Sequence, residues 1–390
     1  MANNHTAVIS HYDVNLSDAA AGIRIDQKEI IRRRKERSSY TLDTPKRCLL
    51  CNRRFAGNQK ISICNSHSIP QFTLKQIQSG KLLGLNAFIG VPWLPNESGR
   101  RNAGTFHLVC TRCDSTYFKN YENISIYDDS FSDRNDLQII LNEIAMKNYL
   151  YTLSDHTSGM ALKKQYLQRN ENLPEEDRAY CEKDIRTEDA EIEDAKKSLR
   201  RTKEVRENLR KKKIEEYQLI YYKIFDRLFP IAFQSKVTVE FDPWGNHVNS
   251  LLELNKSTQD IHLCIFPLED KTAVCAFSRK SDSRIAPMIK NINNIENDDD
   301  IVKALLAMGI ASSGNFYISP HISEQTKSDP YLKQLAGETG EVVSVVSSEI
   351  PLDKERADDL AQQSVRNNGV TGAKKLIEEY DRIPDELLGL

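Results

Sequence analysis

Cys48-Leu49-Leu50-Cys51 and Cys110-Thr111-Arg112-Cys113 form two Cys-x-x-Cys pairs, with Cys64-Asn65-Ser66-His67-Ser68-Ile69-Pro70 between them. Two thiolates at this spacing can hold one metal ion from a tight turn, and two such turns complete a tetrahedral zinc site made of sulfur. The predicted ligands of a structural Zn²⁺ are therefore Cys48, Cys51, Cys110 and Cys113. One ion would then join two stretches that lie far apart in the chain.

A second ligand set satisfies the same spacing rules, because Cys64 and His67 are also two residues apart. In that set Cys48, Cys51, Cys64 and His67 would hold the ion. It would use His67 as a ligand and leave the second Cys-x-x-Cys pair without a partner. The set of four cysteines is favoured for that reason.

The composition sets wide limits on partners. The 390 residues can form two or three domains. Charged residues make up 28% of the chain, but the net charge is only -2, so the overall charge does not indicate a nucleic-acid partner. The stretch 24–60 nevertheless holds 12 Lys and Arg against 4 Asp and Glu. A basic segment beside a zinc module suits phosphate binding, and a solvated basic helix explains it equally well.

The chain is expected to be cytoplasmic and to have no membrane contact. Its first residues, MANNHTAVISHYD, lack the basic-then-apolar pattern of a signal peptide, and no apolar run reaches membrane-spanning length. Thiols stay reduced in the cytoplasm, so paired cysteines there favour a metal over a disulfide.

The expected fold class is α+β, in four units. They are an N-terminal arm with a basic helix (1–45), a zinc module with a following helix (46–155), a charged helical segment (156–227) and a C-terminal α+β domain (228–390). The long charged helix also offers a surface for self-association.

Local patterns place the elements inside these units. Helices are predicted at 22–37, 71–78, 114–122, 136–151, 301–308 and 358–380, with one long helix from Pro174 to about Arg227. Strands are predicted at 60–64, 105–109, 236–241, 261–270 and 271–280, the last two joined by a turn near Glu269 and Asp270. The glycines and prolines of 81–104 indicate a long loop or insert.

Three stretches, CLLC (48–51), SHSIP (66–70) and LVCTRCD (108–114), carry a resemblance to a known family. The segment 46–122 resembles the HNH (ββα-metal) endonucleases in their treble-clef form. The resemblance implies a small treble-clef module and a metal-dependent nucleic-acid phosphodiesterase, with DNA as the first substrate to consider. It also implies bacterial defence against phage or plasmid DNA, together with a protein partner such as an ATPase or sensor.

The resemblance also implies a role for single residues. His67 matches the family's general base, and a neutral imidazole can take a proton from the attacking water. Asp114 matches a position in reach of a catalytic Mg²⁺ or Mn²⁺, which would neutralise charge on the phosphate. The cations expected to clamp neighbouring phosphates are Arg53, Arg54, Arg112 and Lys119.

The sequence departs from the family pattern beside the histidine. Ser66 stands where many members have an acidic metal ligand. The family's middle asparagine has no clear match, with Asn102 and His107 as candidates. Asp128 or Asp129 could complete a metal site if the fold brings one of them near Asp114.

Simpler roles therefore stand beside the catalytic ones. His67 can be a structural turn residue, and Asp114 can cap a helix that starts after it. The alternative function is a non-catalytic zinc-binding module that binds nucleic acid or a protein. A third hypothesis makes the zinc module a scaffold and puts any activity in the C-terminal domain.

Overall fold

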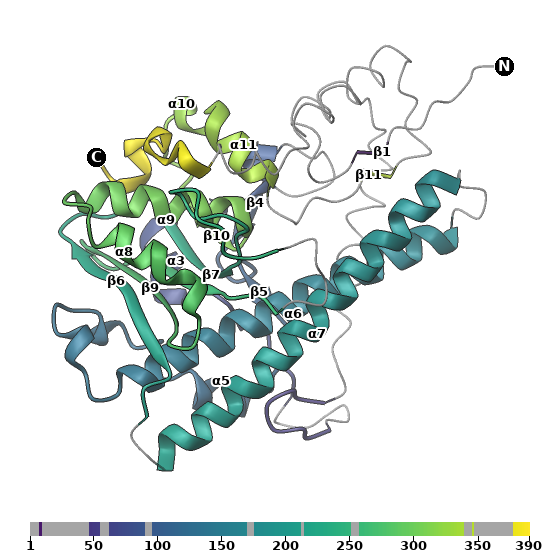
Figure 1. The fold of residues 1–390 in the computed structure, drawn as a ribbon, viewed down its shortest axis with the longest axis horizontal. Coiled ribbons are helices and arrows are strands. Elements are labelled where there is room, and N and C mark those ends of the chain that lie inside the picture. Colours follow the sequence, from purple (N-terminus) through teal and green to yellow (C-terminus); the bar gives the residue numbers. More distant parts are fainter. Residues whose placement is uncertain are drawn as a thin grey trace.

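The structure is a computed structural model in which residues 8–9, 47–54, 62–89, 96–169, 175–211, 214–250, 257–338, 345–346 and 377–390 are described. Its centre is a seven-stranded sheet with helices on both faces (Figure 1), so the expected α+β class is confirmed. The strands lie in the order β4-β3-β10-β7-β8-β9-β6, and all neighbours are antiparallel.

Two small sheets accompany the large one, β1 with β11 and β2 with β5. The strand bounds are β1 Val8–Ile9, β2 Ser66–His67, β3 Lys81–Leu83, β4 Glu97–Gly99, β5 Thr105–Phe106, β6 Tyr217–Phe225, β7 Ile231–Val237, β8 Ile261–Pro267, β9 Thr272–Arg279, β10 Phe316–Ile318 and β11 Val345–Val346.

The helices range from single turns to two that exceed thirty residues. They are α3 Gln71–Ile77, α4 Asn86–Ile89, α5 Thr111–Tyr117, α6 Leu137–Arg169, α7 Glu175–Lys211, α8 Ala286–Ile292, α9 Asp298–Ser312, α10 Glu324–Lys327 and α11 Pro330–Glu338. Short 3-10 helices are η1 Ile124–Ile126, η2 Phe131–Asp133, η3 Ser283–Ile285, η4 Tyr380–Arg382 and η5 Asp385–Leu388.

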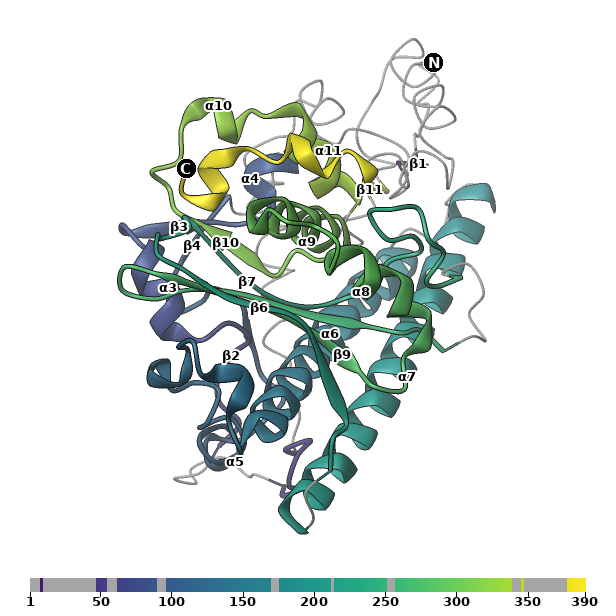
Figure 2. The ribbon, with the colours of Figure 1, turned by 60° about the vertical axis from the view of Figure 1, so that its left-hand side comes forward.

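The central strands are buried on both faces because each face has its own core. In β8, Leu263 and Ile265 join the core beneath α9, whereas Cys264 and Phe266 point to α6. Figure 2 shows α8, α9 and the C-terminal segment on one side of the sheet, and α3, α6 and α7 on the other. The cysteine-bearing module belongs to the α6 side, since Cys48, Cys110 and Cys113 share that core.

Several sequence predictions are confirmed. The helix predicted at 71–78 is α3, that at 301–308 lies inside α9, and the strands at 261–270 and 271–280 are β8 and β9. The turn between them is closed by the Leu268 amide, which donates to the carbonyl of Lys271. Of the strand predicted at 105–109, only the two residues of β5 form a strand. The strand predicted at 236–241 is shifted toward the C-terminus relative to β7, which ends at Val237.

Two predictions of secondary structure differ from the observed elements. The loop alternative for residues 81–104 is contradicted, since their described part (81–89 and 96–104) contains β3, α4 and β4, and Leu82, Phe88 and Ile89 are buried. The helix that begins near residue 174 does not reach Arg227 but ends at Lys211. The aromatic and β-branched run that follows forms β6, because it pairs with β9 along its full length.

The predicted boundaries after residues 155 and 227 remain predictions about independent folding. Helix α6 runs through the first, and β6 and β9 pair across the second. The predicted N-terminal helix at 22–37 and most of the helix at 358–380 lie outside the described residues, as do Lys60 and Ile61 of the predicted strand at 60–64. In the described part of the chain, no helix is long and apolar enough to cross a membrane.

Candidate metal centre and the polar cluster beside it

The four cysteines of the two Cys-x-x-Cys pairs lie together, with all four sulfur atoms within 4.8 Å of one another. A Zn–S bond of about 2.3 Å in a tetrahedron places two sulfurs about 3.8 Å apart. The sulfurs of Cys51 and Cys110 are 3.9 Å apart, which agrees with that geometry. The cluster could therefore hold a metal such as zinc.

Local backbone geometry builds the first half of this cluster. The amide of Asn52 donates to the carbonyl of Cys48 at 2.8 Å, and the amide of Cys48 donates to the carbonyl of Arg53 at 3.0 Å. Asn52 has a φ of 56°, a left-handed conformation that asparagine tolerates better than most residues. The resulting tight turn points Cys48 and Cys51 the same way.

The second half of the cluster is the start of a helix. Cys110 is the N-cap of α5 and Cys113 lies in its first turn, so both thiols face the Cys48–Cys51 turn. The Cys110 amide also donates to the sulfur of Cys48 at 3.3 Å. Burial raises the pKa of Cys48, and burial together with the neighbouring thiols raises that of Cys113. A divalent cation would favour the thiolates and so oppose this shift.

The competing ligand set is not assembled. The thiol of Cys64 donates to the carbonyl of Val109 at 3.3 Å, and burial raises its pKa to about 12. Among the described residues, the four cysteines are the one group of His, Cys, Asp and Glu side chains arranged as a metal site. His67 is therefore not consumed as a ligand of this ion.

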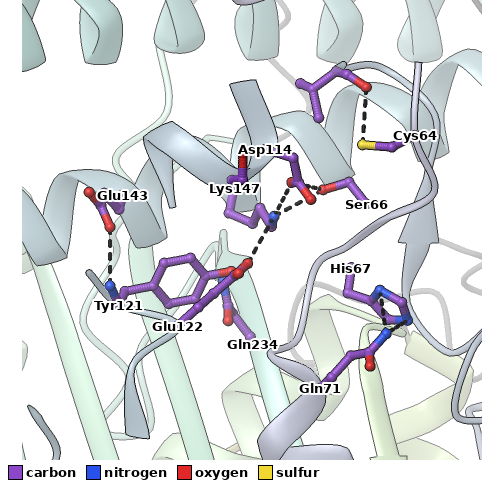
Figure 3. Close-up of polar contacts among 12 residues, drawn as sticks. Cys64, Ser66, His67, Gln71, Asp114, Tyr121, Glu122, Glu143, Lys147 and Gln234 are labelled. Carbon is purple, nitrogen blue, oxygen red and sulfur yellow. Dashed lines mark hydrogen bonds and ion pairs between the residues drawn. The ribbon is translucent and has the colours of Figure 1, made fainter. Parts of the chain in front are cut away.

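His67 lies half-buried at the end of β2, and both of its ring nitrogens have neighbours. Nε2 is 3.2 Å from the carbonyl oxygen of Arg100, so it carries the proton and donates. The Gln71 side-chain nitrogen lies 3.3 Å from Nδ1 and 3.2 Å from Nε2 (Figure 3), and with Nε2 protonated it can donate only to Nδ1. Burial lowers the pKa of His67, so the imidazole is neutral at physiological pH.

Asp114 belongs to a different polar cluster from His67. Its Oδ1 accepts from Ser66 Oγ at 2.5 Å and from Lys147 Nζ at 2.8 Å. Ser66 and His67 are successive residues of a strand, and successive side chains point to opposite faces. Figure 3 shows Ser66 directed to Asp114 and Lys147, with His67 beside Gln71.

Lys147 of α6 is the centre of this second cluster. Its Nζ donates to Ser66 Oγ at 2.9 Å and lies 3.2 Å from the carboxylate of Glu122, while its side chain is fully buried. The ammonium also lies 4.0 Å from the centre of the Phe118 ring. One buried cation thus holds together residues from β2, α5 and the turn that follows α5.

The other predicted site residues are exposed or half-buried. The four candidate phosphate clamps are all exposed, and they are Arg53, Arg54, Arg112 and Lys119. Asn102 is exposed and His107 half-buried. Asp128 caps a surface turn by accepting from the amide and hydroxyl of Ser130, and Asp129 is exposed, so neither completes a metal site with Asp114.

The N-cap role considered for Asp114 is wrong. Helix α5 begins at Thr111, which puts Asp114 inside its first turn, where a carboxylate is favoured by the helix dipole. Sequence reasoning missed Lys147 altogether. The signal was present, since Lys147 follows Ile140 and Ile144 by seven and three residues and so shares their apolar face.

Comparison of the chain with protein-family models, curated proteins and solved structures found no match. The arrangement itself is that of an α+β protein with a four-cysteine site that could hold a metal. A zinc ion there would tie the 48–51 turn to α5 and would have no open coordination position, as is usual for structural sites.

Proposed function

We propose that this chain acts as a non-catalytic zinc-binding module that binds nucleic acid. One observation carries the proposal: the carboxylate of Asp114, which divalent-metal chemistry would need, is held by Lys147 and Ser66 and is not directed to His67. A base and a metal ligand must face one phosphate to cleave it. A zinc module that lacks this pairing can still bind phosphates through its exposed cations.

Nucleic acid is the partner that the exposed charge favours. Arg53 lies just after the first cysteine pair, Arg112 lies between the two cysteines of the second, and Lys119 lies just beyond α5. All three are exposed, and Arg53 and Arg112 lie within two residues of a cysteine of the metal cluster. Cations held at fixed spacing can neutralise several phosphates at once, which gives sequence-independent binding.

A metal-dependent phosphodiesterase, the HNH-type nuclease, is the second candidate. His67 favours it, because the imidazole is neutral, half-exposed and not used as a ligand of the four-cysteine site. Gln71, which occupies Nδ1, is itself exposed, so a substrate could displace its amide. The expected protein partner, an ATPase or sensor, remains a prediction under either function.

Binding and cleavage are measured on the same samples. Zinc-loaded protein is titrated with fluorescent duplex DNA, single-stranded DNA and RNA at several salt concentrations. We expect log Kd to rise with log salt by about one unit for each phosphate that the protein neutralises. Arg112→Gln and Lys119→Gln should each weaken binding and lower this slope by about one, and Lys290→Gln, an exposed cation on α8, should change neither.

The same nucleic acids are then incubated with Mg²⁺ or Mn²⁺. The proposal predicts no cleavage by the wild-type protein. Cleavage that disappears in His67→Ala, with zinc content and folding unchanged, would instead establish the phosphodiesterase. Absence of binding to all three nucleic acids would contradict both functions and favour a protein partner.

A further inference from the structure

The oxygens around Lys147 resemble the ligands of a hard divalent cation. Two carboxylates, Asp114 and Glu122, and the hydroxyl of Ser66 all lie within 3.2 Å of one Nζ atom. Carboxylate and other oxygen ligands are those that Mg²⁺ and Mn²⁺ prefer.

A divalent ion does not fit while Lys147 is present. The Nζ–oxygen distances of 2.8 to 3.2 Å are hydrogen-bond lengths, and Mg²⁺ requires oxygens at about 2.0 to 2.1 Å. The ammonium fills the space between these oxygens, and its side chain is fully buried. A second cation at the same point would meet a positive charge at close range.

Helix α6 keeps the ammonium in this position. The neighbouring residue Asn148 is buried and lies 3.1 Å from the ring of His262 on β8, and it accepts a hydrogen bond from Gln234 on β7. These contacts fix the helix on the sheet. The Phe118 ring, 4.0 Å from the ammonium, covers the cluster from another side, so Lys147 cannot swing into solvent without opening the core.

We infer that Lys147 supplies the cation of this site permanently, and that the cluster is a latent divalent-cation site which becomes able to bind Mn²⁺ or Mg²⁺ when the ammonium is removed. The inference rests on the proposed function, because it explains why a non-catalytic zinc module would hold no catalytic Mg²⁺ or Mn²⁺ beside Asp114. Its test measures metal binding alone, so a failure to bind nucleic acid leaves it standing.

The test compares Lys147→Met with the wild-type protein and with Arg206→Met, all loaded with zinc. Arg206 is a matched control because its buried partner, Glu143, is a single carboxylate that offers no second carboxylate for a metal. Thermal melting is followed with and without Mn²⁺, and Mn²⁺ binding is followed by electron paramagnetic resonance. Without added metal, Lys147→Met should melt below the wild type, because two partly exposed carboxylates lose their counter-charge.

Added Mn²⁺ should raise the melting temperature of Lys147→Met by several degrees once it exceeds Kd about 100-fold, and it should leave the other two proteins unchanged. If Lys147→Met does not fold in the absence of metal, refolding with Mn²⁺ should recover it. The double variant Lys147→Met/Glu122→Gln guards against misfolding, since it removes one carboxylate and should fold without metal while binding Mn²⁺ more weakly. Equal Mn²⁺ binding by wild type and Lys147→Met, or none by the single and the double variant, would overturn the inference.

Discussion

Removing one partner of the buried Glu143–Arg206 pair should strongly destabilise the fold, because this pair joins both long helices to the turn after α5. Arg206 Nη1 lies 3.2 Å from Glu143 Oε1, and the two side chains are 5% and 0% exposed. Glu143 also accepts from the amides of Asn120 and Tyr121 at 3.0 and 3.1 Å and from the Asn120 side chain at 2.7 Å.

The size of the effect follows from this environment. Removing one partner of a buried pair typically costs about 3 to 5 kcal/mol, since it leaves an uncompensated charge. Arg206→Met leaves Glu143 with its other donors, so the loss should lie near the lower end, at about 3 kcal/mol. In Arg206→Met/Glu143→Gln the buried charge disappears as well. The loss in the double variant should therefore fall short of the sum of the single losses by about 0.5 to 3 kcal/mol.

Urea unfolding of the zinc-loaded proteins, followed by circular dichroism, measures these free energies. Arg134→Met is the matched control, because Arg134 and Asp136 form a partly exposed pair and a surface pair contributes about 0 to 1 kcal/mol. A loss below about 1 kcal/mol for Arg206→Met, with an unchanged denaturant slope, would refute the reasoning. Additive losses in the double variant would show that the two side chains do not act as a pair.

Two further perturbations test other parts of the fold. Burial lowers the pKa of His156, but the hydrogen bond and charge of Glu188 outweigh burial and leave that pKa above its ordinary value. The protonated imidazole therefore stabilises the α6–α7 pair below about pH 6.5, and this stabilisation is lost as pH rises through the folded pKa. Amide hydrogen exchange of α6 and α7, corrected for intrinsic rates, should show that protection in the wild type falls as pH rises. His156→Gln should not show this fall, and an equal pH dependence of protection in both proteins would contradict the reasoning. The second perturbation is Gly309→Ala in α9. Its Cβ would lie 2.9 Å from the Phe233 ring and 3.0 Å from Leu263. Because this crowding exceeds the gain in helix propensity, the free energy of unfolding should fall by about 1 to 2 kcal/mol. A melting temperature that stays the same or rises would show that the packing beneath α9 is looser than these distances indicate.

The metal cluster could be predicted from sequence because its information is local. Each Cys-x-x-Cys pair builds its own half of the site, one in a tight turn and the other at a helix start. The spacing of Cys64 and His67 allows a second ligand set, and the four cysteines are favoured over it because they use both pairs. The polar cluster of Lys147 could not be predicted in the same way. Its three oxygens come from Ser66, Asp114 and Glu122, and only the folded chain brings them to a lysine of α6.

The sheet shows the same division between local and distant information. Strands β8 and β9 are adjacent in sequence and strongly apolar, so the local pattern predicts both. Strand β6 follows a long charged helix, so the local pattern extends that helix into it, and its pairing with β9 decides its conformation. Strand β3 is hidden among glycines and prolines, and it forms because Leu82 and Leu83 are buried where β3 pairs with β10.

Zinc content per chain tests the central claim most directly. Purified wild-type protein should contain about one zinc ion per chain by mass spectrometry of the metal, since four cysteines make one closed site. Cys113→Ser should lose that zinc and destabilise the segment around α5, whereas Cys64→Ser and His67→Ala should keep it. Zinc retained in Cys113→Ser but lost in Cys64→Ser and His67→Ala would contradict the assignment of the four cysteines as its ligands.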